Sequence, residues 1–243
     1  MDDSYEIFAD HIETLDSFLR VNNYVNTNRP LKGLKTDDFF KALRENFQKN
    51  EELSRLIEVD DLRKLLSGIF YHKHIPDKKI FIYFCPTGNN NMTASVQNFL
   101  RLLCNIENCK NGVIITDRDL SPGAKKEIEK VKDNNCPDTY DVYNIKMFTD
   151  KTFVNIVENN FVPKVLNVFN SEEVKTLVNN NKVKETKLPK IIVDDPLCSF
   201  YMAKVGNIIE LERDTGIEGS ILQTQLVYRL VTDIPYTRKG SRR

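Results

Sequence analysis

A short basic segment in the middle of the chain carries the residue types that bind phosphate groups. It reads Arg-Asp-Leu-Ser-Pro-Gly-Ala-Lys-Lys from Arg118 to Lys126. Ser121-Pro122 is a typical helix start, with serine as the N-cap and proline at the first helical position. The free N–H groups and the positive dipole end of such a helix favour an anion, and Arg118, Lys125 and Lys126 add positive charge. The segment is therefore a candidate for contact with a phosphate, but these residues alone favour the alternative, an ordinary capped surface helix.

A Pro-Asp pair ending at Asp77 is the second motif that could do chemistry. Restriction-type nucleases combine such a pair with an Asp/Glu-x-Lys sequence on the next strand, so that carboxylates converge on Mg²⁺ and a lysine lies near the attacking water. The next predicted strand, over 112–116, is followed by Asp117 and Asp119 without that lysine, and the Glu-Thr-Lys sequence ending at Lys187 lies in another module. Because the ligand set is incomplete, we do not expect a working nuclease.

The remaining candidates for chemistry lack the partners that they would need. His72 and His74 have no further metal ligands nearby in sequence, and Cys104 and Cys109 lack the close pair spacing of structural zinc sites. The chain has no Walker A sequence, and its three histidines give little support for a nucleophile–histidine pair. We therefore predict no catalytic residue, no metal and no cofactor.

Charge and composition limit the classes of protein that remain. Lys and Arg total 35, and Asp and Glu total 35, so the formal net charge is zero. A free-standing nucleic-acid binder is usually basic, so any nucleic-acid contact is expected to be local and weak without partners. Five cysteines, an odd number, indicate an intracellular protein with reduced thiols. No apolar stretch is long enough to span a membrane, and the initial Met-Asp-Asp cannot open a signal peptide, so no membrane partner is expected.

The elements that would position these residues fall into two parts within the first 160 residues, a helical part over 1–70 and an α/β part over 71–160. Helical spacing of apolar residues predicts helices over Ser4–Leu19, from an N-cap at Thr36, and over Glu51–Phe70. Further along, buried strands are predicted over 79–85, 112–116 and 140–145, and helices over 93–104, 122–132 and 149–159. This alternation predicts an α/β domain with a mostly parallel sheet that is covered on both faces.

A small α+β module is predicted over 161–235, followed by a basic tail over 236–243 that is expected to be disordered. Pro163 disfavours helix continuation and marks the boundary. Within the module, a β-branched run predicts a buried strand, Asp195-Pro196 starts a short helix, and Gly206 permits a turn with positive φ. Such a small module has a marginal core and open sheet edges, so its stable state is expected to include a partner chain.

The order of motifs in this module resembles a known family. The matching features are Leu-Pro-Lys-Ile around Pro189, Asp195-Pro196, Lys-Val-Gly from Lys204 to Gly206, Arg213 in the following strand, and Tyr-Arg-Leu-Val from Tyr228 to Val231; Phe161–Lys164 and Ser171–Val174 match as well. In these features the chain is similar to the fifth subunit of eukaryotic RNA polymerases, which polymerases I, II and III share and which has a counterpart in the archaeal enzyme. Recognisable similarity covers about residues 79–231.

The resemblance implies a fold and two interfaces. It implies a nuclease-like jaw domain without a nuclease site over 1–160, and an assembly domain that docks on the largest polymerase subunit. The family carries a Thr/Ser-Pro-x-Ala-Lys segment near downstream duplex DNA, which implies weak, sequence-independent phosphate contacts. The implied DNA-binding residues are Arg118, Ser121, Pro122, Lys125 and Lys126. The implied subunit-interface residues are Pro189, Asp195, Pro196, Lys204, Gly206, Arg213, Tyr228 and Arg229.

Two features of the last strands leave alternatives open. Arg213 and Arg229 could instead pair across strands with Glu210 or Glu212, which would stabilise little if the pairs are exposed. The family's turn between the last two strands is replaced by a longer segment over 214–225.

We interpret the chain as a non-catalytic subunit of a multisubunit DNA-directed RNA polymerase, with the largest and other core subunits and downstream duplex DNA as partners. It is expected to be intracellular with its polymerase, in the nucleus for a cellular protein and in the virion or host cytoplasm for a viral one. Asparagine clusters and the divergent first 70 residues suit a virus-encoded copy in a large DNA virus, with an AT-rich protist as the alternative. A metal-dependent nuclease and a free transcription-regulatory interaction module are the competing functions.

Overall fold

The computed structural model divides the chain into two compact units, Met1–Val157 (unit 1) and Glu158–Arg243 (unit 2). It describes residues 3–26, 34–88, 91–132, 143–158, 162–181, 187–214 and 224–233. The predicted tail over 236–243 and most of the longer segment over 214–225 lie outside these residues. Within the described ranges, no helix combines the length and apolar character needed to cross a membrane.

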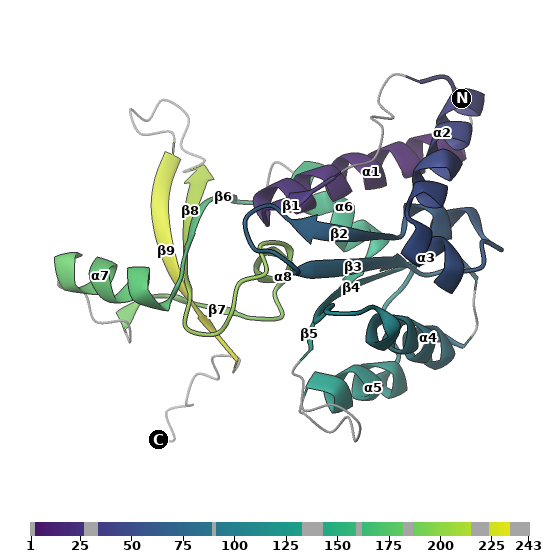
Figure 1. Cartoon of the computed structure of the whole chain (residues 1–243). Coiled ribbons are helices and arrows are strands. Elements are labelled where there is room, and N and C mark those ends of the chain that lie inside the picture. The colour runs from purple at the N-terminus through teal and green to yellow at the C-terminus, as the bar shows by residue number, and fades with distance from the viewer. Residues whose placement is uncertain are drawn as a thin grey trace, which may run out of the picture. The chain divides into compact units, whose positions relative to one another are not determined.

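Unit 1 is built on a sheet with the strand order β1-β2-β3-β4-β5 (Figure 1). The strands are β1 (Tyr24–Val25), β2 (Gly68–His72), β3 (Lys79–Phe84), β4 (Asn111–Thr116) and β5 (Asn144–Thr149). The helices are α1 (Asp3–Val21), α2 (Thr36–Lys49), α3 (Glu51–Leu56), the 3₁₀ helix η1 (Leu62–Leu66), α4 (Met92–Asn105), α5 (Pro122–Lys132) and α6 (Asp150–Glu158). Strands β3, β4 and β5 run parallel, and β2 and β1 extend the sheet in antiparallel pairing.

Helices cover both faces of this sheet, with α1 and α6 on one side and α4 and α5 on the other (Figure 1). Side chains of β3 alternate between the two sides. Phe81 stacks on Phe99 of α4 with ring centroids 5.6 Å apart, whereas Phe84 meets Phe153 of α6 edge-on at 6.2 Å. All four rings are fully buried. The burial of both faces explains why β3 is apolar from Ile80 to Phe84, and it confirms a sheet covered on both faces. The sheet is mixed and not mostly parallel, because two of its four strand pairings are antiparallel.

The prediction of one long helix over 51–70 is wrong. Helix α3 ends at Leu56, Ile57 is extended, and η1 and then β2 follow. Strand β2 pairs with β3 in antiparallel register, with Gly68 opposite Ile82. The leucines of this stretch have helical propensity, but the Ile-Phe-Tyr run in β2 suits a strand, and pairing with β3 outweighs the local preference.

Two further boundaries differ from the predictions. Lys35 occupies the N-cap position of α2 without a side-chain cap, so Thr36 is the first helical residue and not the cap. Strand β5 covers 144–149, whereas 140–145 was predicted, and residues 140–142 lie outside the described part of the chain. Pairing with β4 sets the limits of β5, because Asn144 lies opposite Asn111 and Thr149 lies opposite Thr116.

Unit 2 contains a second sheet with the strand order β6-β8-β9-β7. Its elements are β6 (Lys164–Phe169), α7 (Ser171–Asn181), β7 (Lys190–Ile192), α8 (Pro196–Phe200), β8 (Ile208–Asp214) and β9 (Thr224–Thr232). Strand β8 pairs antiparallel with β6 and β9, and β7 pairs parallel with β9. Asp195 Oδ1 accepts the Leu197 N–H at 2.9 Å, and Gly206 has a φ of +89°. The predicted helix start and glycine turn are therefore confirmed.

Candidate nucleic-acid and subunit interfaces

The five predicted DNA-contact residues lie together in the loop after β4 and the first turn of α5. Ser121 Oγ accepts the Ala124 N–H at 3.2 Å, and the Ser121 carbonyl oxygen accepts the Lys125 N–H at 3.0 Å. Serine is thus the predicted cap, with Pro122 at the first helical position. The side chains of Arg118, Lys125 and Lys126 are exposed.

This capping leaves few free backbone donors at the start of α5. Pro122 has no N–H, and the N–H groups of Ala124 and Lys125 are occupied. Among the first four positions of α5, all of them described, only the Gly123 N–H lacks a hydrogen-bond acceptor. An anion at this position would therefore depend on the side-chain cations more than on the helix end.

Nearby carboxylates limit the positive charge around these cations. The Arg118 Nε lies 3.9 Å from Asp117 Oδ1, and Asp117 Oδ2 also accepts the Gly88 N–H at 3.3 Å. On the exposed side of α5, Lys130 lies 2.7 Å from Glu127, and this hydrogen bond lowers the pKa of Glu127. The surface is therefore only locally basic, as expected for a chain with zero formal net charge.

The carboxylates considered for metal binding do not converge. Asp77 lies in the turn before β3 with a φ of +62°, whereas Asp117 and Asp119 follow β4. Because the neighbouring strands β3 and β4 run parallel, the start of β3 and the end of β4 lie at opposite ends of this strand pair, about 20 Å apart. Within the described ranges, no group of three or more His, Cys, Asp or Glu side chains could hold a metal ion.

His72 has a structural role in the turn between β2 and β3. Its Nδ1 accepts the backbone N–H groups of His74 and Ile75, each at 3.1 Å. Burial lowers the pKa of His72, and the neighbouring positive charge lowers it further. A neutral ring that accepts two backbone hydrogen bonds accounts for this residue without a metal.

Tertiary packing creates a buried ion cluster that sequence reasoning missed. Arg63 Nη2 donates to Asp150 Oδ1 at 2.6 Å, and Nη1 donates to the other carboxylate oxygen. His11 Nε2 lies 3.0 Å from Asp150 Oδ1, and Nδ1 lies 2.6 Å from the Ile7 carbonyl oxygen, so both ring nitrogens face acceptors. Burial raises the pKa of Asp150, but the hydrogen bonds from His11 and Arg63 outweigh this effect and hold the pKa below its usual range.

The ion cluster joins α1 and η1 to the start of α6. Its members are separated by up to 139 residues, so no local spacing could have indicated it. Nearby Cys85 is buried, which raises the pKa of its thiol to about 12. A protonated, buried thiol is a poor nucleophile, so we interpret the cluster as a structural tie and not as a catalytic site.

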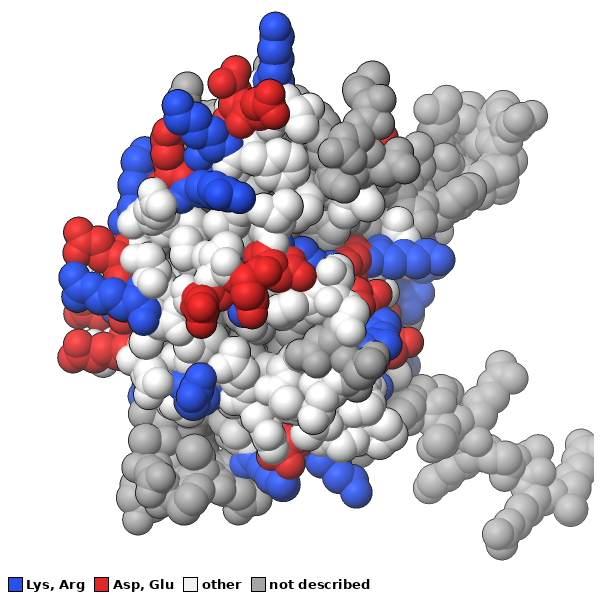
Figure 2. All heavy atoms as spheres, turned by 90° about the vertical axis from the view of Figure 1, so that its right-hand side faces the viewer, with Lys and Arg blue, Asp and Glu red and all other residues white. Residues whose placement is uncertain are grey.

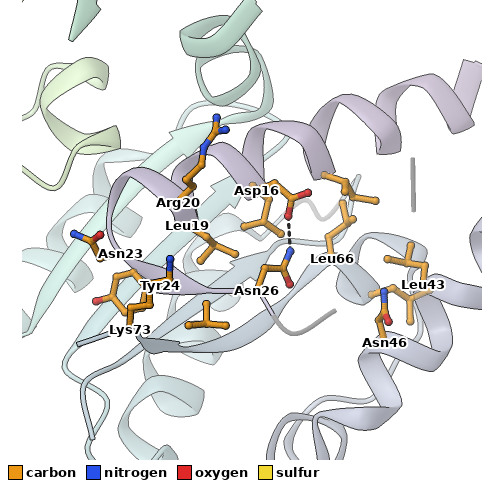
Figure 3. A pocket seen from close by; sticks show the side chains of 14 residues that line it. Asp16, Leu19, Arg20, Asn23, Tyr24, Asn26, Leu43, Asn46, Leu66 and Lys73 are labelled. Carbon is orange, nitrogen blue, oxygen red and sulfur yellow. Dashed lines mark hydrogen bonds between the residues drawn. The ribbon is translucent and has the colours of Figure 1, made fainter. Parts of the chain in front are cut away.

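A hollow of about 440 Å³ lies between α1, β1, α2 and η1. Figure 3 shows the side chains that line it. Leu19, Leu43 and Leu66 contribute apolar surface to it. Asp16 lies at the surface and accepts a hydrogen bond from the Asn26 side chain, and desolvation by the protein around it raises the pKa of Asp16. None of the predicted DNA-contact or interface residues lines this hollow.

Most of the predicted interface residues of unit 2 lie around β7, β9 and the turn before β8, whereas Arg213 lies near the other end of β8. The Pro189 carbonyl oxygen accepts the Leu230 N–H of β9 at 2.9 Å. The Lys204 N–H donates to Asn207 Oδ1 at 2.7 Å. The Gly206 N–H donates to the carbonyl oxygen of Val231 in β9 at 3.0 Å. Asp195 and Pro196 start α8, and Arg213 lies exposed near the end of β8.

The alternative of arginine–glutamate pairing is not what the structure shows. Glu210 instead accepts the Tyr228 hydroxyl at 2.6 Å, and Glu212 lies 3.7 Å from Lys164 Nζ. Arg229 faces away from Glu210, because its neighbour Tyr228 lies opposite Glu210 and successive side chains of a strand alternate. The Nη1 of Arg229 has a long contact of 3.5 Å with a backbone carbonyl oxygen, and its buried Nε has no hydrogen-bond partner among the described residues.

Known proteins match both the small module and most of the chain. Residues 154–231 match the family model described as "RNA polymerase Rpb5, C-terminal domain". A relative in Caenorhabditis elegans, "DNA-directed RNA polymerases I, II, and III subunit RPABC1", is 24% identical over 174 residues, which cover 70% of this chain and 76% of the relative. The corresponding protein of Dictyostelium discoideum is 21% identical over 165 residues, covering 68% and 79%. "DNA-directed RNA polymerase subunit Rpo5" of Staphylothermus marinus is 34% identical over 73 residues, covering 30% of this chain and 79% of the relative.

The matched module, with its capped α8, its glycine turn and its Tyr-Arg strand, defines a subunit of multisubunit DNA-directed RNA polymerases. The chain belongs to the Rpb5 family. This finding confirms the resemblance seen in the sequence. It gives no support to a metal-dependent nuclease or to a free regulatory module.

Proposed function

We propose that the chain acts as a non-catalytic, positioning subunit of its polymerase. In this proposal unit 1, with a nuclease-like fold, forms part of the jaw around downstream DNA, and unit 2 docks on the largest subunit. The protein would be found wherever that polymerase works in the cell. The match of residues 154–231 to the Rpb5 C-terminal domain is the observation that carries the proposal.

Surface properties of unit 2 support docking. Four large apolar side chains are between 38% and 54% exposed: Leu166, Ile192, Val205 and Leu226. Strands β6 and β7 are the edges of the described sheet, and sheet edges can pair with another chain. The buried Nε of Arg229 is a donor that a carboxylate or carbonyl group of a partner could satisfy.

The start of α5 supports a weak contact with DNA. Arg118, Lys125 and Lys126 present exposed cations on one loop and one helix turn, but Asp117 and Asp119 stand close in sequence. Three cations neutralise at most about three phosphates, and each such contact contributes a slope of about one to the salt dependence of binding. The proposed contact therefore adds affinity for DNA without sequence specificity.

Replacing Arg229 by Met tests the docking role. The variant keeps an apolar stem but loses the guanidinium, and we expect salt-resistant co-purification with the largest subunit to weaken at least about tenfold. Lys175→Met changes an exposed cation of α7 and serves as the matched control. Equal retention of both variants would exclude Arg229 from the interface, and purification of the wild-type chain without any polymerase subunit would refute the function itself.

Charge reversal at Lys125 and Lys126 tests the DNA contact. In the assembled polymerase, Lys125→Glu with Lys126→Glu should reduce crosslinking of unit 1 to downstream duplex DNA and lower the salt slope by about two. Lys130→Glu, on the same helix, is the control for a general change of charge. If crosslinking and salt slope stay at the wild-type values while the subunit remains in the complex, α5 does not contact DNA.

A further inference from the structure

Unit 1 has two adjoining hollows beside the connection between α3 and η1. The smaller hollow, of about 440 Å³, lies against the start of α1 and against η1. The larger, of about 740 Å³, lies against the end of α2 and the connection itself. Asp61 and Leu62 line both hollows. The two hollows, with residues 57–62 between them, are named here the α3–η1 groove.

Apolar side chains line the groove and also project from it. The buried apolar lining consists of Phe8 and Leu66 in the smaller hollow, and Phe47, Ile57 and Leu65 in the larger one. Ile7 is 54% exposed, and Val59 and Leu62 are each 41% exposed. An exposed set of large apolar side chains beside apolar hollows is typical of a surface that binds another protein.

The outer surface of the groove is acidic. Glu58 and Asp60 are exposed and Asp61 is half-buried, while Arg44 is the exposed cation among the lining residues. Lys64 is buried, with Nζ 2.5 Å from Asp60 Oδ1 and 3.1 Å from the Glu58 carbonyl oxygen, so it partly neutralises Asp60, and Glu58 and Asp61 are the other acidic side chains of the groove. Figure 2 shows acidic side chains gathered in a band across the middle of one face, with uncharged surface on either side.

Hydrogen bonds hold the connection in one conformation. Asp61 Oδ1 accepts the Arg63 N–H at 2.7 Å, and Oδ2 accepts the Thr87 N–H at 3.2 Å. The side chain of Arg63 is tied in turn to Asp150, and Arg63 and Lys64 are only 7% and 8% exposed. A surface that is already ordered loses little conformational entropy when a partner binds.

We propose that the α3–η1 groove binds a basic segment of another protein. Apolar side chains of this segment enter the two hollows, and its Lys or Arg side chains face Glu58, Asp60 and Asp61. The acidic surface repels phosphates, which disfavours DNA or RNA as the occupant. The inference depends neither on the docking of unit 2 nor on the contact of α5 with DNA.

Titration of the full-length, ¹⁵N-labelled chain with a designed probe tests the proposal. The probe is a synthetic helix-forming peptide with leucines at helical spacing and lysines elsewhere, and its control carries glutamates in place of the lysines. We expect the lysine peptide to shift the amide signals of residues 57–62 and of the start of α1, with an affinity that falls as salt rises. Equal binding of the glutamate peptide, shifts confined to other parts of the chain, or no binding would each overturn the proposal.

Variants of the groove distinguish peptide binding at this surface from non-specific binding to exposed apolar side chains. Leu62→Ser and Glu58→Lys should each weaken binding of the lysine peptide at least about fivefold. Ile75→Ser removes a similarly exposed apolar side chain from the turn before β3 and should leave the affinity unchanged. Circular dichroism checks that each variant is folded. Unchanged affinity in both groove variants, or the same amide shifts on addition of duplex DNA, would contradict the assignment.

Discussion

Replacement of Asp150 by Asn should destabilise unit 1, because this carboxylate accepts two hydrogen bonds from the buried Arg63 guanidinium and lies within hydrogen-bond distance of the buried His11 ring. Arg63 donates to both of its oxygens, and His11 Nε2 lies 3.0 Å from one of them. His11 and Arg63 are 4% and 7% exposed, so water has little access to the groups that would lose their acceptor. The amide of asparagine keeps one oxygen, but its NH₂ group would meet an Arg63 donor.

The magnitude follows from the burial of the partners. Removing one member of a buried ion pair costs about 3–5 kcal/mol, because the other charge is left uncompensated. The side chain of Asp150 is 25% exposed, so some water reaches it, and we expect a loss of about 2–3 kcal/mol in the free energy of unfolding. For a unit of this size, such a loss lowers Tm by about 4–12 °C.

The pH dependence has a definite sign. The pKa of Asp150 is lower in the folded protein than its ordinary value of 3.8, so its stabilisation is present above that value and is lost as pH falls through the folded pKa. The difference between wild type and Asp150→Asn should therefore be constant near neutral pH and shrink in acid. Urea unfolding followed by circular dichroism over a pH series measures both quantities.

Asp16→Asn is the matched control for the same chemical change. Asp16 lies at the surface, and desolvation by the protein around it raises its pKa, so loss of its charge removes an unfavourable term and should change stability by less than about 0.5 kcal/mol at neutral pH. A loss below about 1 kcal/mol for Asp150→Asn, or an equal loss for both variants, would refute the assignment of the ion cluster as a structural tie.

Three further predictions concern Gly206, Gly112 and His72. Gly206→Ala should lower the unfolding free energy by about 1–2 kcal/mol in thermal melts; φ is +89° and a Cβ would meet no atom within 4 Å, so backbone strain is the only cost. Gly112→Ala should cost about 1–3 kcal/mol in urea unfolding, because its Cβ would lie 2.8 Å from Phe99 and 2.9 Å from Leu103; a smaller loss would show that these side chains can move. Burial lowers the pKa of His72, so wild-type stability should fall as pH drops below the ordinary histidine value of 6.5. His72→Asn keeps an acceptor but does not titrate, so its profile of stability against pH should be flatter. Parallel profiles for the two proteins would contradict this.

Local chemistry made much of the fold predictable. Ser121-Pro122 and Asp195-Pro196 each supply a cap and a first helical residue within two positions, so both helix starts follow from neighbouring atoms. Gly206 takes the positive φ that its lack of a Cβ permits. The apolar run of β3 indicated a strand buried on both faces, because a strand exposed on one face would alternate with polar residues.

Other features depended on residues far apart in the chain. The stretch after Leu56 has helical propensity, yet β2 forms there because β3 offers a ladder of backbone partners. Pairing with β4 likewise shifted β5 from its predicted position. Glu210 and Glu212 suggested cross-strand ion pairs with Arg229, but Glu210 faces Tyr228 in the folded sheet.

The amino-acid sequence by itself determined the family, the alternation of strands and helices in unit 1, and the capped starts of α5 and α8, because these depend on residue types within a few positions of one another. Only the tertiary structure decided that His11, Arg63 and Asp150 share one buried cluster, and that Asp77 and Asp117 lie at opposite ends of the paired strands β3 and β4. The physical reason is distance along the chain. A cap or a turn is closed by its own neighbours, whereas an ion cluster, a metal site or a binding groove exists only after packing has brought remote segments together.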